Sequence, residues 1–108
     1  MLKICAGCAF HRGYKKVNNE DNFLFDHKIL RDSAIKTGSY QKTVSKNSIC
    51  FAVFDGMGGL PAGEQASKIA AETLLDRVCK NKPEKKPDEK WLSRVLHAIN
   101  AAVACYGQ

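Results

Sequence analysis

A short apolar run that ends in an aspartate and a glycine-rich segment constrains this chain more than any other feature. Ile49 to Phe54 can form a strand buried on both faces, and Asp55 follows it directly. Gly56, Gly58 and Gly59 come next, and glycine permits tight turns and a close approach of backbone to an ion or phosphate. The pattern therefore predicts a strand end at the rim of a sheet, with Asp55 at the boundary between core and solvent.

A second acidic segment, Asn18 to Asn22, directly precedes the apolar residues Phe23 to Phe25. Its adjacent carboxylates, Glu20 and Asp21, repel one another, and desolvating unpaired charges costs several kcal/mol, so we expect a cation nearby. Hard oxygen ligands of this kind suit magnesium or manganese better than zinc. Taken alone, the segment favours a polar hairpin tip, because acidic pairs are common at strand starts.

Four segments in a fixed order carry a family resemblance. They are Gly13 to Lys16, Val17 to Leu24, Phe51 to Gly59 and Ala62 to Ser67. In this order they resemble the PP2C-type (PPM) metal-dependent protein serine/threonine phosphatases, particularly the bacterial members. The combination of Asn-Glu-Asp, Asp-Gly-Met-Gly-Gly and Ala-Gly-Glu is more specific than any one of these motifs, and the likeness spans nearly the whole chain.

The resemblance implies a fold and an activity. The fold would be α+β, a partial four-layer α/β/β/α sandwich of antiparallel sheets with flanking helices. Residues 1–108 would form the amino-terminal part of a single phosphatase domain. The complete domain would hydrolyse phosphoserine and phosphothreonine in protein substrates, with two Mn²⁺ or Mg²⁺ ions as cofactors.

The resemblance also implies site roles. Asp55 would bridge both metals, Glu20 and the carbonyl of Gly56 would complete one of them, and Asp21 would hold metal-bound water. Asp55 and Asp21 are thus the predicted catalytic residues, while Glu20, Asp55 and Gly56 are the predicted metal ligands. Two divalent cations can activate a water for in-line attack on phosphorus.

Two positions depart from the family pattern. Lys16 stands where the family has an arginine that binds the substrate phosphate, and lysine keeps the charge but loses the bidentate fork. We therefore predict weaker phosphate binding at Lys16, with Lys15 or Arg12 as additional candidates. The alternative is that Lys16 is merely a solvated surface lysine. Met57 replaces the histidine of the animal enzymes, so no acid catalysis is inferred there.

The sequence lacks the later metal-binding aspartates that the resemblance implies. We therefore expect the chain to be a portion of the domain that is inactive alone. A catalytically silent binding or assembly module is the alternative function. An incomplete sandwich exposes strand edges and an apolar sheet face, so self-association is expected.

Apolar patterning predicts three strands, over Leu2 to Phe10, Asn22 to Leu30 and Ile49 to Phe54, of which the last is expected to be the most buried. Arg31 to Asn47 is polar and lacks a clear period, which predicts a long loop or loose hairpin.

Two helices are predicted after these strands. The first starts near Pro61. Its apolar stripe comprises Ala66, Ile69, Ala70, Leu74 and Val78. The second follows a charged connector and starts near Asp88, a plausible N-cap. Its apolar side comprises Trp91, Leu92, Val95, Leu96, Ile99, Ala102 and Val103.

The net charge of +6 and pI near 9.2 raise the question of a polyanionic partner. The lysines, however, are scattered through polar segments and mixed with acidic residues, which is typical of a solvated surface. This distribution predicts neither a nucleic-acid nor a membrane partner, and the family resemblance implies phosphoprotein substrates.

Cys5 and Cys8 form a Cys-x-x-Cys pair, but a zinc site needs four ligands. If Leu2 to Phe10 is a strand, these two side chains point to opposite faces. Zinc or redox chemistry is therefore the minor alternative. An odd number of cysteines without a signal sequence fits a reducing cytoplasm.

Overall fold

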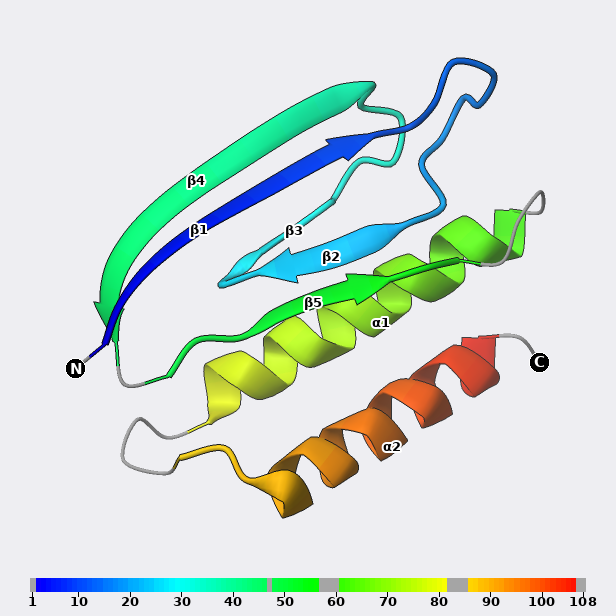
Figure 1. Cartoon of the computed structure of the whole chain (residues 1–108). Coiled ribbons are helices and arrows are strands. Elements are labelled where there is room, and N and C mark those ends of the chain that lie inside the picture. Colours follow the sequence, from blue (N-terminus) through cyan, green and yellow to red (C-terminus); the bar gives the residue numbers. More distant parts are fainter. Residues whose placement is uncertain (1, 47, 57–60, 82–85, 107–108) are drawn as a thin grey trace.

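The computed structural model describes residues 2–46, 48–56, 61–81 and 86–106. These residues form an α+β fold of strands and two helices (Figure 1). In chain order the elements are β1 (Leu2–His11), β2 (Asn22–Phe25), β3 (Lys28–Ile29), β4 (Thr37–Lys46), β5 (Phe51–Phe54), α1 (Pro61–Lys80) and α2 (Glu89–Tyr106). The predicted fold class is confirmed.

The elements are arranged in layers. Strands β1 and β4 form a two-stranded antiparallel sheet, which lies over a three-stranded sheet of order β3-β2-β5. Helix α1 covers the other face of the three-stranded sheet, and α2 packs against α1 (Figure 1). The described residues therefore supply a β/β/α arrangement, and the fourth layer of a PP2C-like sandwich stays a prediction.

Strand β2 lies at the centre of the molecule, and all four of its residues are buried. Phe23 and Phe25 belong to the cluster between the two sheets, with Leu30, Phe10 and Tyr40. Leu24 belongs to the cluster between the three-stranded sheet and the helices. Successive side chains of a strand point to opposite faces, so β2 joins the two cores.

The prediction that Ile49 to Phe54 would be the most buried strand is wrong. Among the described strands, β5 pairs only with β2 and lies at the edge of its sheet. Val53 is 82% exposed and Phe51 is 44% exposed, whereas Ala52 and Phe54 pack against the helix-side core. An apolar strand is buried on both faces only if another layer covers each face. The described part of the β1–β4 sheet leaves Val53 uncovered.

The expected loop over Arg31 to Asn47 contains a ten-residue strand, β4. It pairs with β1 along its whole length, from Leu2 opposite Lys46 to His11 opposite Thr37. The sequence signal is weak because most of its side chains are polar; Tyr40 alone reaches the cluster between the sheets. Here backbone pairing with β1 decides the conformation.

The predicted strand over Asn22 to Leu30 is instead a hairpin of β2 and β3. The chain reverses at Asp26, whose φ of 60° lies in the left-handed region. Aspartate adopts this conformation more readily than most residues because its short side chain can form local polar contacts. The hairpin turns both Leu24 and Ile29 toward the helices.

The helix boundaries agree with the sequence. Helix α1 begins at Pro61, and Ala70, Ala71 and Leu74 are buried beneath the three-stranded sheet. Asp88 caps α2, because its Oδ1 accepts a hydrogen bond of 2.8 Å from the backbone N–H of Trp91. The predicted N-cap is therefore confirmed.

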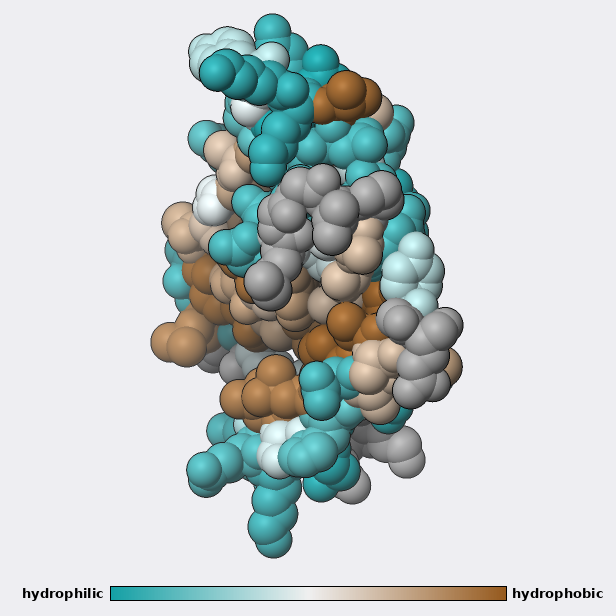
Figure 2. All heavy atoms as spheres, turned by 90° about the vertical axis from the view of Figure 1, so that its right-hand side faces the viewer, coloured by the Kyte–Doolittle hydropathy of each residue, from teal (hydrophilic) through white to brown (hydrophobic). Residues whose placement is uncertain are grey.

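The apolar side of α2 is only partly covered. Trp91, Val95 and Ile99 pack on the core, but Leu92 and Leu96 are 49% and 55% exposed. Figure 2 shows apolar side chains across the middle of the face at the right-hand side of Figure 1, between hydrophilic regions. The predicted apolar side of α2 therefore includes residues that are not buried. Within the described ranges, neither helix is apolar enough over a sufficient length to cross a bilayer.

Candidate metal and phosphate site at the β2–β5 rim

The pairing of β2 with β5 explains why two acidic residues meet. The last pair of the antiparallel ladder is Asn22 opposite Phe54. Asp21 immediately precedes β2 and Asp55 immediately follows β5, so one further step brings these two residues to the same edge. Segments more than thirty residues apart in the sequence therefore converge on one rim.

The carboxyl groups of Asp21 and Asp55 lie in contact with each other, and both residues are exposed. Desolvation raises the pKa of Asp21, and the contact with Asp55 and its negative charge raise it further. A hydrogen bond from the Gly56 backbone opposes this rise, and the charge of Glu20 adds a smaller increase. The rim thus brings carboxylates close enough together to disfavour the ionisation of Asp21.

Glu20 points toward Lys16 at this rim. Its Oε1 lies 3.3 Å from Lys16 Nζ, and the side chains are 15% and 53% exposed respectively. The five residues predicted from the sequence, Lys16, Glu20, Asp21, Asp55 and Gly56, all line one open hollow of about 650 Å³. The structure therefore brings the predicted site residues together.

Gly56 lies where no larger residue fits. A Cβ added at this position would overlap the backbone carbonyl oxygens of Glu20 and Gly63. Both neighbours are main-chain atoms, so neither can move aside as a flexible side chain could. The close approach of the rim to the first turn of α1 thus depends on glycine at position 56.

Ser67 is a site residue that the sequence analysis missed. It is buried on α1, and its hydroxyl donates a hydrogen bond of 2.6 Å to the carbonyl oxygen of Glu20. Asn19 is also buried, and its Oδ1 accepts a hydrogen bond of 3.0 Å from the Asp21 N–H. Both belong to the segments on which the family resemblance rests, yet their types alone did not reveal these contacts.

The loops flanking the rim are joined by further hydrogen bonds. Ser33 Oγ donates to Glu64 Oε1 at 2.7 Å, and the Asn19 N–H donates to the Ser33 carbonyl at 2.7 Å. Arg12 Nη1 donates to the carbonyl oxygen of Ala34 at 2.7 Å. Arg12 also lines the hollow, and the phosphate contact considered for it from the sequence stays a prediction.

The donor chemistry of the rim suits a hard divalent cation. Carboxylate oxygens from Glu20, Asp21 and Asp55 and the carbonyl of Gly56 are the ligand types that magnesium and manganese prefer. Across the described ranges, no three His, Cys, Asp or Glu side chains are already arranged as a metal-binding group. A cation that uses the Glu20 carboxylate would have to displace its contact with Lys16.

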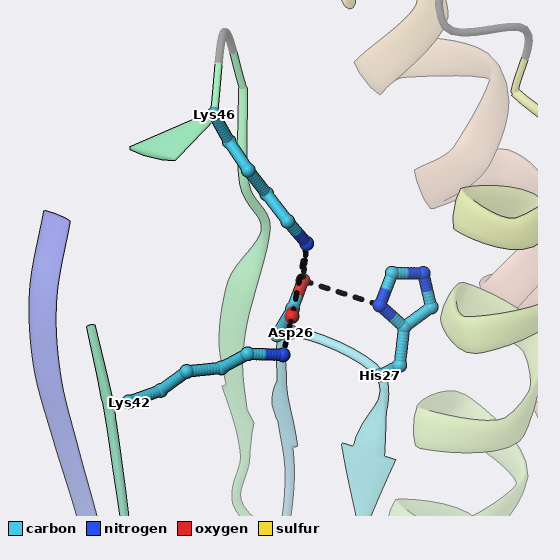
Figure 3. Close-up of polar contacts among 4 residues, drawn as sticks. All are labelled: Asp26, His27, Lys42 and Lys46. Carbon is cyan, nitrogen blue, oxygen red and sulfur yellow. Dashed lines mark hydrogen bonds and ion pairs between the residues drawn. The ribbon is translucent and has the colours of Figure 1, made fainter. Parts of the chain in front are cut away.

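A cluster of ion pairs around Asp26 lies at the tip of the β2–β3 hairpin (Figure 3). Asp26 is buried and forms ion pairs with Lys42 and, at 2.9 Å, with Lys46. His27 Nδ1 lies 3.2 Å from Asp26 Oδ1. Although burial by itself raises the pKa of Asp26, its hydrogen bonds and charge interactions with the two lysines lower it below the usual value. This cluster fastens the hairpin to β4 and is separate from the rim.

The cysteine pair lies in the middle of β1. The strand is continuous, with Cys5 exposed and Cys8 packed toward the cluster between the sheets. Burial raises the pKa of the Cys8 thiol, which disfavours the thiolate that metal binding requires. The two side chains therefore occupy opposite faces, as the strand prediction required. Met57 lies outside the described residues.

Comparison of the chain with protein-family models, with curated proteins and with solved structures gave no match.

Proposed function

We propose that the β2–β5 rim is the active-site half of a PP2C-type, metal-dependent protein serine/threonine phosphatase. In this proposal residues 1–108 belong to the amino-terminal part of the catalytic domain, and the reaction is hydrolysis of phosphoserine and phosphothreonine. The cofactors are two Mn²⁺ or Mg²⁺ ions. Because the sequence lacks the later aspartate ligands of the family, we expect no turnover from these residues alone.

One observation carries this proposal: the strand register sets Asp21 beside Asp55, and Glu20 and Lys16 line the same hollow. At the hairpin tip, two lysines neutralise Asp26. At the rim, Lys16 pairs with Glu20, while desolvation and the contact with Asp55 raise the pKa of Asp21. Adjacent carboxyls in a hollow, one with a raised pKa, are characteristic of sites that a cationic ligand completes.

Each residue then has a defined task. Asp55 follows β5 and Asp21 precedes β2, so both carboxylates lie at the edge where the cations would bind. Glu20 adds a third carboxylate there. Lys16 binds the substrate phosphate as a point charge, without the orientation that an arginine fork would impose. The bound cations supply charge stabilisation and water activation for in-line attack on phosphorus.

The test is phosphate release from an aryl phosphate and a phosphothreonine peptide by the full-length protein that carries this chain. We expect Mn²⁺-dependent release that EDTA abolishes and that Asp55→Asn lowers by about 100-fold or more, the size expected from losing several kcal/mol of charge stabilisation. Asp76→Asn is the matched control, since Asp76 lies exposed on α1 in an ion pair with Lys80. Equal activity of the Asp55 and Asp76 variants would refute the proposal.

A catalytically silent assembly module is the second candidate, favoured by the open strand edges. β1 and β5 each lack a partner strand on one side among the described residues, and a hollow of about 620 Å³ lies between them. Its lining is largely apolar and includes Phe51 and Val53. Such edges and apolar surfaces favour association between chains.

Sedimentation velocity over a wide range of protein concentration tests this candidate. Assembly through the β1–β5 edges predicts oligomers that Val53→Lys weakens. Leu96→Lys, on the exposed side of α2, is the matched control and is expected to leave them intact. A wild-type monomer at every concentration would exclude self-assembly.

A further inference from the structure

The Lys16–Glu20 ion pair joins two residues that the proposed function uses separately. Lys16 is assigned to the phosphate and Glu20 to a cation, yet their charged atoms lie 3.3 Å apart. Both residues lie in the irregular segment between β1 and β2, so helical geometry does not force their contact. The ammonium group therefore occupies the carboxylate oxygen that a divalent cation would need.

The two partners differ in how firmly they are held. Glu20 is anchored at its backbone by the Ser67 hydroxyl, and its side chain is only 15% exposed. Lys16 is 53% exposed, so its long side chain can swing into solvent without breaking a buried contact. When the pair opens, Lys16 moves and Glu20 stays. A half-exposed ion pair is also weak enough to be exchanged, because solvent screens the attraction between its charges.

We propose that Lys16 is the resident counterion of Glu20 and competes with the divalent cation for it, an inference that rests on the proposed function. A positive ammonium and a divalent cation repel each other and need the same carboxylate, so each lowers the occupancy of the other. Cation binding releases the ammonium within the hollow that both residues line. Lysine suits this exchange because a point charge is released more easily than a bidentate guanidinium.

Mn²⁺ titration of the isotopically labelled chain tests this competition without requiring turnover. Mn²⁺ is paramagnetic and broadens the amide signals of nearby residues, here Glu20, Asp21, Asp55 and Gly56. The Asp26 amide is an internal reference, because its carboxylate is already neutralised by lysines. Unchanged signals elsewhere in the spectrum show that each variant is folded.

Lys16→Gln is expected to bind Mn²⁺ about two- to fivefold more tightly than Lys15→Gln, the range set by a half-exposed ion pair. Lys15 lines the same hollow but makes no ion pair with any described residue, so its variant removes the same charge without touching Glu20. Lys16→Arg should bind Mn²⁺ no more tightly than the wild type. In a Glu20→Gln background the difference between the two lysine variants should disappear.

Two other outcomes separate the inference from the function on which it rests. Equal Mn²⁺ affinities for Lys16→Gln and Lys15→Gln, with broadening at the rim, would overturn the competition and leave the phosphatase proposal standing. No broadening at the rim in any variant would overturn both.

Discussion

Aspartates lie at strand ends in two regions of the molecule, and their surroundings differ: Asp26 is buried, whereas Asp21 and Asp55 are exposed. At the hairpin tip, Asp26 is neutralised by Lys42 and Lys46, and its pKa is lowered by these lysines despite its burial. At the β2–β5 rim, desolvation and the adjacent Asp55 raise the pKa of Asp21. The first arrangement stabilises the fold without any ligand. The second disfavours the ionisation of Asp21, and a perturbed pKa in a hollow marks a candidate functional site.

Gly56→Ala should show the largest effect, at the rim. The new methyl group would overlap two backbone carbonyls, so strands and helix must separate, at a cost of about 3 kcal/mol in the free energy of unfolding. Gly7→Ala on β1 is the control, because its Cβ would meet only the Tyr40 carbonyl oxygen at an ordinary 3.9 Å. Urea denaturation of both variants measures the difference. A Gly56→Ala protein as stable as Gly7→Ala would show that the rim and α1 are not tightly packed.

Asp26→Asn should have the next largest effect, at the hairpin tip. Asparagine tolerates the positive φ of this position, so the change removes charge while keeping the backbone. We expect a loss of about 2 kcal/mol at neutral pH, since both lysines lose their counterion.

The pH dependence identifies the cause of this loss. The folded-state pKa of Asp26 is lowered, so its contribution is complete above the usual aspartate value near 4 and fades as the pH falls through the lowered pKa. The wild type and Asp26→Asn should therefore converge in stability in acid. A constant gap down to the most acidic measurable pH would assign the loss to packing instead.

Asp21→Asn should have the smallest effect, and its sign should be opposite. Because the fold raises the pKa of Asp21, its ionisation disfavours the native state, and this cost develops as the pH rises from about 4 through the raised pKa. At neutral pH the variant should melt about 1–3 °C higher than the wild type, the size expected for a charge screened by solvent. In acid the two proteins should melt at the same temperature. Scanning calorimetry across this pH range measures the difference. A lower melting temperature for Asp21→Asn than for the wild type at neutral pH would contradict the comparison between the rim and the hairpin tip.

Local signals in the sequence were sufficient for several elements. Proline at position 61 and aspartate at position 88 fix the two helix starts, because helix termini depend on nearby backbone groups. The acidic pair before Phe23 and the Asp-Gly step after Phe54 likewise identified the residues of the rim. Such signals act over a few residues and can be read without knowing the fold.

Other features depended on partners distant in the sequence. β4 is polar, and only its pairing with β1 makes it a strand. β5 looks more apolar than β2, yet its edge position leaves Val53 exposed. The hydrogen bond from Ser67 to Glu20 joins residues that no local pattern connects.

The sequence by itself determined the residue types of the candidate site, the two helix starts, and the presence of a strand directly after Asp21 and directly before Asp55. Only the tertiary structure decided that Asp21 lies against Asp55, that Glu20 faces Lys16 and that β2 is the central strand. The physical reason is that strand register and layer packing are set by contacts between distant segments, and a shift of one residue would turn these side chains to the other face.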